Sequence, residues 1–165
     1  MKEEKTNVMR ILDQKKIAYT PYFYECEEAV SGVEAAKRMG LPEETVFKTL
    51  VTVGKSGEHF VFVIPVAAEL DLKKAATAVG EKSIEMIPQK DLLPLTGYIH
   101  GGCSPIGMKK SFRTTFDQSA EAIDAITFSA GRIGCQVRLP LESVRKAIRL
   151  STAQVCKETK QEERQ

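Results

Sequence analysis

Apolar and polar residues alternate along this chain in two rhythms, one typical of helices and one typical of strands. Apolar residues spaced three and four positions apart predict helices, whereas runs of β-branched and aromatic residues predict strands. The predicted helices cover residues 8–16, 31–39, 71–79, 88–93, 120–124 and 140–150. The predicted strands cover residues 17–24, 46–53, 60–65, 84–87, 112–116, 125–129 and 135–139.

Capping residues mark the ends of two of these helices. Ser31 and Glu34 have the spacing of a capping box, and Gly40 supplies the stop. Asp71 is a typical N-cap, and the helix that it starts ends at Gly80. Glycine-containing turns are predicted at residues 54–57, where they join two strands into a hairpin, and at residues 129–134.

The order of the predicted elements bears on the fold class. Helices interrupt the strands irregularly, unlike the regular alternation of a doubly wound parallel sheet. The sequence therefore predicts a mixed α/β fold, with a single domain built on a mixed, partly closed β-sheet or barrel and flanking helices. Residues 1–156 should form this domain, and residues 157–165, which include no apolar residue, should form a disordered polar tail.

Length and composition are those of an ordinary soluble domain. The chain has 165 residues, of which 42% are hydrophobic and 28% charged. No apolar run approaches the roughly 18 residues that a membrane-spanning helix needs. The first residues are polar and do not resemble a secretory signal. We therefore expect a cytoplasmic protein with no membrane segment.

The cysteines and histidines give little sign of metal chemistry. The four cysteines are scattered and form no closely spaced pair, which argues against a zinc site and a disulfide framework. We expect four reduced thiols, no metal and no cofactor. His59 starts an apolar strand and should be structural. His100 adjoins a glycine-rich segment, where a turn residue is a commoner role than a catalytic base.

That glycine-rich segment, Thr96–Gly107, is the leading site candidate. It holds four glycines and a proline within twelve residues. Glycine lets the backbone approach a ligand closely, and such a loop can present main-chain N–H groups to an anion or a carbonyl oxygen. A plain turn is the alternative, although twelve residues exceed what a hairpin turn requires.

Charge is distributed unevenly along the chain. The net charge of +2 excludes a strongly basic nucleic-acid-binding protein. Residues 101–150, however, carry eight basic and four acidic residues. This stretch could form a basic face that contacts a phosphate backbone, or a solvated helix face, and charge alone does not decide between them.

Two further side chains carry candidate chemistry. A strand places Lys48 on the same face as Val46 and Leu50. A lysine between apolar neighbours either extends to the rim of the sheet, which the pattern alone favours, or projects into a polar cavity. Tyr24 ends the preceding strand, where a half-buried packing role is usual for a tyrosine.

Taken together, three motifs resemble the YbaK family of aminoacyl-tRNA deacylases, which is similar to the editing domain inserted in bacterial prolyl-tRNA synthetase. The motifs are Phe47-Lys48-Thr49-Leu50, the glycine-rich segment Thr96–Gly107, and Ser129-Ala130-Gly131. The resemblance covers roughly residues 7–150. It implies a free-standing, metal-free editing enzyme that removes cysteine from mischarged proline tRNA. Mischarged tRNA would be its partner, with prolyl-tRNA synthetase as a further candidate.

The resemblance also implies roles for individual residues. The catalytic residues would be Lys48, Gly101 and Ser129. The substrate-binding residues would be Tyr24, Gly102, Cys103, Ser104 and Gly131. Because they follow the glycine-rich segment, Lys109, Lys110 and Arg113 would bind tRNA without reading its bases.

The mechanism that the resemblance implies needs no catalytic triad, because an aminoacyl ester is already activated. The thiol of the substrate cysteine attacks its own ester carbonyl, cyclises and releases the tRNA. Lys48 would hold the terminal ribose or a phosphate, and N–H groups of residues 101–103 would face the carbonyl. Alanine and serine have no comparably nucleophilic group.

The chain departs from the family pattern at two places. Family members often have Ser-Gly-Gly followed by a Lys-Arg pair, where this chain has Ser129-Ala130-Gly131-Arg132-Ile133, and Cys103 stands where an aliphatic residue is common. The first departure leaves the width of the pocket, and hence the amino-acid preference, open. The alternatives are a deacylase for another small amino acid such as alanine, and a non-catalytic binding or regulatory relative.

Overall fold

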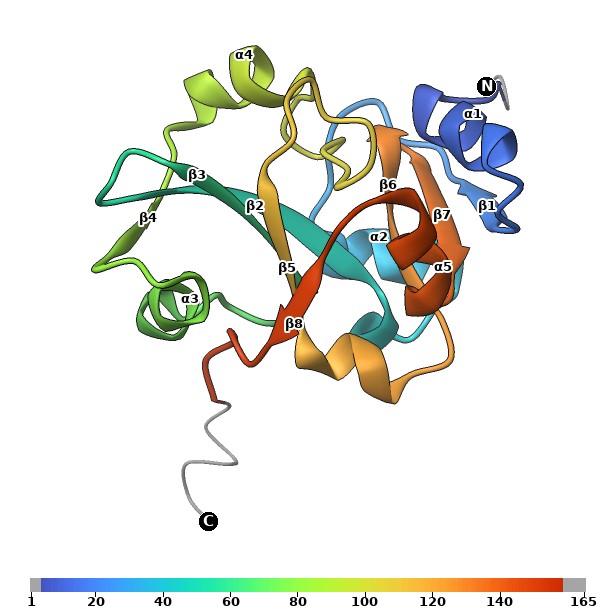
Figure 1. The fold of residues 1–165 in the computed structure, drawn as a ribbon. Coiled ribbons are helices and arrows are strands. Elements are labelled where there is room, and N and C mark those ends of the chain that lie inside the picture. Colours follow the sequence, from blue (N-terminus) through green and yellow to red (C-terminus); the bar gives the residue numbers. More distant parts are fainter. Residues whose placement is uncertain (1–3, 159–165) are drawn as a thin grey trace.

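The computed structural model describes residues 4–158, which form two β-sheets with helices around them (Figure 1). The strands are β1 (Thr20–Phe23), β2 (Phe47–Gly54), β3 (His59–Pro65), β4 (Ile84–Met86), β5 (Arg113–Asp117), β6 (Ile126–Arg132), β7 (Cys135–Leu139) and β8 (Ser151–Ala153). The α-helices are α1 (Asn7–Gln14), α2 (Gly32–Met39), α3 (Leu72–Val79), α4 (Leu92–Thr96) and α5 (Leu141–Ala147). Short 3-10 helices cover Glu43–Thr45, Gln89–Asp91 and Gln118–Ala122.

The strand order confirms the predicted mixed α/β class. A five-stranded sheet has the order β4-β2-β3-β5-β8, and a three-stranded sheet has the order β1-β7-β6. The three-stranded sheet is antiparallel, whereas the larger sheet combines antiparallel pairs with the parallel pairs β3–β5 and β5–β8. An isolated parallel bridge between Val46 and Thr127 links the two sheets, so the β-structure is partly closed on itself.

Side chains from both faces of the five-stranded sheet are buried. On β3, Val61 and Val63 point into the main core, which lies between the sheets and includes α1. The alternate residues, Phe60, Phe62 and Ile64, point into a second core beneath α3. Figure 1 shows α3 beside β4 and α1 beside the three-stranded sheet. Because β3 is covered on both faces, it reads as an unbroken apolar run.

The predicted helix caps are confirmed. The Ser31 hydroxyl accepts a hydrogen bond from the Glu34 N–H at 3.1 Å, and Gly40 ends α2 with a φ of 71°. The Asp71 carboxylate accepts from two N–H groups in the first turn of α3, both at 3.0 Å. Gly80 ends that helix with a φ of 77°. Each cap of this kind contributes about 1 kcal/mol.

Three predictions about secondary structure were wrong in detail. The last predicted helix, 140–150, ends at Ala147, and the chain then forms β8. The predicted turn at 129–134 is shorter, because β6 continues through an irregularity to Arg132 before the chain reverses. The predicted helix at 88–93 is a 3-10 turn followed by α4. Most of the predicted tail, residues 159–165, lies outside the described residues.

The helices of the described chain are all short. None within residues 4–158 has both the length and the apolar character that crossing a bilayer demands.

Candidate functional site

The three-stranded sheet has one apolar face and one polar face. On β6 and β7, one set of alternating side chains points into the main core: Phe128, Ala130, Cys135 and Val137. The intervening side chains point the other way: Thr127, Ser129, Gln136 and Arg138. In the register of the two strands, Ser129 lies opposite Gln136, and Thr127 lies opposite Arg138. We call these four residues the polar face.

Buried atoms of the polar face have hydrogen-bonding capacity that the protein does not use. Within the described chain, the Thr127 hydroxyl, the Gln136 carbonyl oxygen and the Arg138 Nε have no hydrogen-bond partner. Gln136 is 8% exposed and Thr127 0%. Buried polar groups are normally paired, so a cluster of unpaired ones on one face indicates a place where a polar ligand can bind.

Tyr24 holds one end of the Gln136 side chain. The Gln136 Nε2 donates to the Tyr24 hydroxyl at 3.1 Å. Whichever way the amide is turned, one end pairs with Tyr24 and the other stays open. Burial raises the pKa of Tyr24, and the hydrogen bond from Gln136 opposes this increase. The phenol therefore stays protonated at neutral pH, and its own O–H remains available to a ligand.

Lys48 reaches this region through the bridge that links the sheets. The bridge pairs Val46 with Thr127 in parallel, and two residues further along each strand are Lys48 and Ser129. Within the described chain, β2 and β6 share no other bridge. The register of this bridge places Lys48 and Ser129 across from each other, with side chains on the same side of the β-structure.

The Lys48 ammonium is not used in a hydrogen bond or an ion pair of the described structure. Its side chain is partly buried, and within residues 4–158 it forms no hydrogen bond or ion pair. Burial lowers the pKa of Lys48, and the nearby Cys156 and Glu69 partly offset that decrease. A desolvated ammonium without a partner attracts an anionic or carbonyl oxygen strongly.

Ser129 is held in place by the turn that follows it. Its hydroxyl oxygen accepts a hydrogen bond from the Gly131 N–H at 3.1 Å, which leaves the hydroxyl hydrogen available. Gly131 has a φ of 95°, and a Cβ there would lie 2.9 Å from the Tyr98 ring. Glycine is therefore required at this position by both backbone conformation and space.

Ala130, which departs from the family pattern, does not face the site. It is fully buried and packs in the main core, on the apolar face of the sheet. A methyl group at this position fills core volume and leaves the polar face unchanged. The structure thus removes the reason to expect a different site width from this substitution.

The glycine-rich loop packs directly against this region. Gly101 has a φ of 88°, and a Cβ there would lie 2.5 Å from the Cβ of Ala29. A Cβ at Gly102 would lie 3.3 Å from the Ile133 backbone nitrogen, in the turn between β6 and β7. The two glycines therefore let the loop pass between the segment after β1 and this turn.

One expected backbone donor of the loop is already used. The Gly102 N–H donates to the Ile99 carbonyl at 3.0 Å, so it is not available to a substrate carbonyl. Cys103 and Ser104 are buried with the main core, and burial raises the pKa of Cys103 to about 12. The Ser104 hydroxyl accepts from the Ile106 N–H at 3.2 Å. The side chains of Cys103 and Ser104 therefore stabilise the conformation of the loop and are not exposed to a substrate.

The three basic residues expected to bind tRNA do not form one group. Arg113 points toward the end of α3, where its guanidinium donates to the Val79 carbonyl at 3.0 Å. Lys109 and Lys110 are exposed, and Lys110 lines a surface hollow. His59 contacts the Phe112 ring at a centroid distance of 5.7 Å, which agrees with its expected structural role.

The cysteines lie apart from one another. All four are free thiols, two buried and two partly buried. Within residues 4–158, His, Cys, Asp and Glu side chains form no group of three or more that could hold a metal ion.

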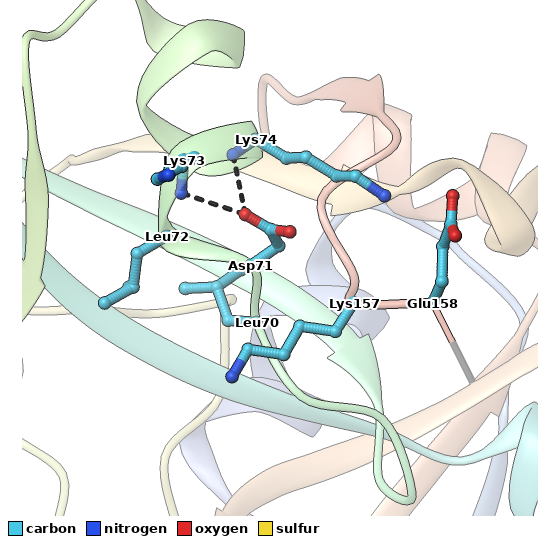
Figure 2. A pocket seen from close by; sticks show the side chains of 7 residues that line it. All are labelled: Leu70, Asp71, Leu72, Lys73, Lys74, Lys157 and Glu158. Carbon is cyan, nitrogen blue, oxygen red and sulfur yellow. Dashed lines mark hydrogen bonds between the residues drawn. The ribbon is translucent and has the colours of Figure 1, made fainter. Parts of the chain in front are cut away.

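A hollow of about 670 Å³ lies at the start of α3 (Figure 2). Three of its five charged side chains have local partners. Asp71 caps the helix, the Lys74 ammonium donates to the Cys156 carbonyl at 3.1 Å, and Lys157 pairs with Glu69 at 3.2 Å. Because no predicted site residue lines this hollow, we do not assign it to the candidate site.

Sequence reasoning missed Gln136 and Thr127 as members of the site. The signal was present in the strand Cys135–Leu139, where Gln136 and Arg138 alternate with apolar residues. Such alternation predicts a half-exposed strand with polar residues in solvent. In the folded chain Gln136 is buried, and only the tertiary structure reveals a buried amide with an open end.

Comparisons with known proteins identify a family and a relative of this chain. The model of the aminoacyl-tRNA editing domain family matches residues 26–147. A protein of Enterococcus faecalis with the provisional name Cys-tRNA(Pro)/Cys-tRNA(Cys) deacylase EbsC is 47% identical over 143 residues, covering 86% of this chain and 87% of the relative.

Two solved structures share the fold. The crystal structure of the hypothetical protein APE2540 aligns with a TM-score of 0.83 at 18% identity, covering 92% of this chain and 100% of the other. A structure described provisionally as a trans-editing enzyme for prolyl tRNA synthetase aligns with a TM-score of 0.78 at 19% identity, covering 94% of this chain and 100% of the other. At these identities the likeness concerns the fold alone.

Proposed function

The chain belongs to the aminoacyl-tRNA editing domain family, and we propose that it is a deacylase that releases cysteine from mischarged proline tRNA in the cytoplasm. One observation in particular supports this assignment. The unpaired Lys48 ammonium, the Ser129 hydroxyl and the open end of the Gln136 amide lie on one side of the β-structure, close to the bridge that links the two sheets.

The site offers groups that suit an aminoacyl ester. Lys48 would hold the terminal ribose or its phosphate as a compact positive charge. Gln136 and Tyr24 together offer an acceptor and a donor, which would orient the α-amino group of the amino acid. Positioning of this kind can supply much of the rate enhancement when the ester is already activated.

The reaction would use the nucleophile of the substrate itself. The cysteine sulfur forms a bond to its own carbonyl carbon, the ester C–O bond breaks, and the thiol proton passes to the departing ribose oxygen. The immediate products are a four-membered thiolactone and uncharged tRNA, and water then opens the thiolactone to free cysteine. The N–H groups of Gly101 and Cys103 remain as candidate donors to the carbonyl oxygen.

A panel of charged tRNAs tests this proposal. Proline tRNA is charged separately with cysteine, serine, alanine and proline, and cysteine tRNA is charged with cysteine. Single-turnover release is then measured for each. We expect rapid release of cysteine and little release of serine, which has the same shape but a much poorer nucleophile.

The other outcomes distinguish the alternatives. Equal release of cysteine, serine and alanine would contradict the thiol-assisted reaction and favour a deacylase for small amino acids in general. Release from none of the charged tRNAs would overturn the enzymatic assignment. Comparison of proline tRNA with cysteine tRNA shows whether the tRNA body contributes to selection. Adding prolyl-tRNA synthetase tests whether that enzyme is a partner.

A further inference from the structure

We propose that a surface hollow between the glycine-rich loop and the end of α5 binds phosphates of the single-stranded 3′ end of the tRNA. The loop–helix hollow, as we call it, has a volume of about 380 Å³. Its lining comes from two segments far apart in sequence, residues 105–114 and residues 147–149. This volume lies within the range of about 300–1,000 Å³ that is usual for small-ligand sites.

The charge of the loop–helix hollow is entirely positive. Its lining includes Lys110 and Arg149 and no carboxylate. Within residues 4–158, neither of these two side chains forms an ion pair or a side-chain hydrogen bond, and both residues are exposed. Two uncompensated cations that face one hollow attract an anion, and guanidinium and ammonium groups both bind phosphate well.

The other described hollows differ in their charge or in the pairing of their cations. A further hollow, lined by Lys73 and Lys74, also has no carboxylate, but its Lys74 ammonium donates to the Cys156 carbonyl at 3.1 Å. In the hollow beside Pro140, Arg145 is paired with Glu121 at 3.6 Å and with Glu142 at 3.1 Å. In the hollow of Figure 2, acidic and basic side chains lie together, and Lys157 is paired with Glu69. Of these four hollows, the loop–helix hollow is therefore the one that is lined by two unpaired cations and by no carboxylate.

The rest of the lining suits a nucleotide rather than a free inorganic ion. Met108 and Ile148 offer apolar surface beside the main core, on which a base or a ribose can lie. The backbone N–H groups of Lys110 and Ser111 donate to no acceptor within the described residues, so they can add to phosphate binding. The apolar surface can contact a base or a ribose and the two cations can contact phosphates, which together suit a single-stranded nucleic acid.

The hollow is also connected to the candidate site by the same loop. Figure 1 shows this loop in yellow between α4 and β5. Both Gly102 and Lys110 belong to it, eight residues apart. Eight residues span at most about 28 Å even when fully extended. The hollow thus lies within a few nucleotides of an ester bound near Ser129. This inference rests on the proposed function and names a tRNA subsite for it.

The test compares tRNA affinity in matched charge variants. The variants are Lys110→Ala, Arg149→Ala, their double variant, and Lys55→Ala as a control that removes a positive charge from the exposed β2–β3 turn. We expect the double variant to weaken tRNA binding about tenfold at low salt. Its slope of log Kd against log salt should fall by about 1.4, the value for two single-stranded phosphates. Lys55→Ala should change neither quantity.

Two further substrates separate this proposal from the proposed function. With a cysteinyl ester of adenosine, which has no phosphate, the turnover defect of the double variant should shrink relative to its defect on charged tRNA. With tRNA that lacks its last four nucleotides, the affinity difference between the double variant and wild type should disappear. If the difference persists on truncated tRNA, or the double variant binds intact tRNA as wild type does, the hollow is not a 3′-end site. Failure of the wild type to release any amino acid would count against the deacylase assignment instead.

Discussion

The two faces of the three-stranded sheet are built by the same strands, yet they use their side chains in opposite ways. On one face, Phe128 and Val137 are fully buried in a continuous apolar core. On the other, buried atoms of Thr127 and Gln136 have no partner within the described chain. The first face gains stability from apolar burial, whereas the second leaves polar groups desolvated at a cost to stability.

This difference teaches where to look for function in a chain of this kind. Desolvated polar groups that the fold does not satisfy persist when a ligand satisfies them. Strained backbone and unpaired buried polar groups concentrate at functional sites, because residues there are selected for activity and not for the stability of the fold. The comparison thus makes a general prediction. Substitutions on the apolar face should change stability more than activity, and substitutions on the polar face should do the reverse.

The largest effect is expected on the apolar face, from Phe128→Ala. Phe128 is 0% exposed and packs edge-to-face against Phe116. Its truncation should lower the free energy of unfolding by about 3–5 kcal/mol. Urea denaturation measures this loss, and Phe128→Leu serves as a milder variant if the alanine form does not fold. The neighbouring Ser129→Ala, on the polar face, should cost no more than about 1 kcal/mol. Equal losses for the two residues would break the comparison.

The next largest effect is expected on activity, from substitutions of Lys48. Lys48→Ala should reduce single-turnover release of cysteine by about a hundredfold or more, or about 2.7 kcal/mol of transition-state stabilisation, because charge and positioning are both lost. Lys48→Arg should recover little, since a planar guanidinium does not replace a compact ammonium. A folded Lys48→Ala variant with near wild-type turnover would return Lys48 to a structural role at the edge of the sheet.

Lys48→Met provides the matched stability measurement. The pKa of Lys48 is lowered in the folded state, so the unfolded chain binds the proton more tightly. The charged ammonium therefore costs stability at pH values below its lowered pKa, and this cost fades as the pH rises toward the pKa of the unfolded chain. Methionine keeps the apolar stem without the charge. We expect a melting temperature equal to or above that of the wild type at neutral pH, together with lost activity.

Local features of the fold could be predicted from sequence, and features that depend on distant pairing could not. The caps at Ser31 and Asp71 are set by residues three positions away or fewer, and both are confirmed. The strand β8 was missed because its only partner within residues 4–158 is β5, more than thirty residues earlier. A three-residue strand with no turn signal beside it gives no periodicity to detect.

The same distinction applies to the candidate site. Strand periodicity placed Lys48 on one face with Leu50, which agrees with the structure. That Ser129 lies across from it depends on the bridge between Val46 and Thr127, a contact that no local pattern predicts. Motif resemblance supplied both residues but not Gln136, whose importance follows from burial rather than from residue type.

A smaller loss of activity is expected from Gln136→Leu, without the loss of stability that most substitutions of buried residues cause. Leucine is similar in size and removes a buried amide that has one unsatisfied end. Stability should stay constant or rise by about 1 kcal/mol, because replacing a poorly satisfied polar group by an apolar one removes a desolvation penalty. Cysteine release should fall about tenfold, since the substrate loses a hydrogen-bond partner worth about 1–1.5 kcal/mol.

Tyr24→Phe is a companion variant for this prediction, because it alters the hydroxyl that Gln136 shares with the proposed site. It removes the hydroxyl that pairs with Gln136 but keeps the aromatic ring. If Gln136 acts on the substrate, Tyr24→Phe should loosen the amide and reduce release less than Gln136→Leu does. If the role of Gln136 is structural only, the result should be the opposite. Gln136→Leu would then be less stable in denaturation experiments and fully active in single-turnover assays.

The smallest effect concerns the pH dependence of the reaction and the carboxylate of Glu69. Deacylation should rise with pH as the substrate thiol ionises, and it should fall again as Lys48 loses its proton. Burial lowers the pKa of Lys48, and Glu69 opposes that decrease. Glu69→Gln removes the opposing charge, so the pKa of Lys48 falls further and the alkaline limb moves to lower pH. Because Glu69 is exposed and screened by solvent, we expect a shift of only a few tenths of a pH unit.

Lys157→Met separates the charge of Glu69 from its ion pair. Lys157 and Glu69 lie 3.2 Å apart, so this variant breaks the same ion pair while keeping the carboxylate. Its alkaline limb should stay at the wild-type pH, and the acidic limb, set by the substrate, should stay constant in both variants. Rates are measured from pH 6 to about 10 with spontaneous ester hydrolysis subtracted. An unchanged alkaline limb in Glu69→Gln would show that the limb does not report the ionisation of Lys48, and the proposed mechanism would lose the evidence for a charged Lys48.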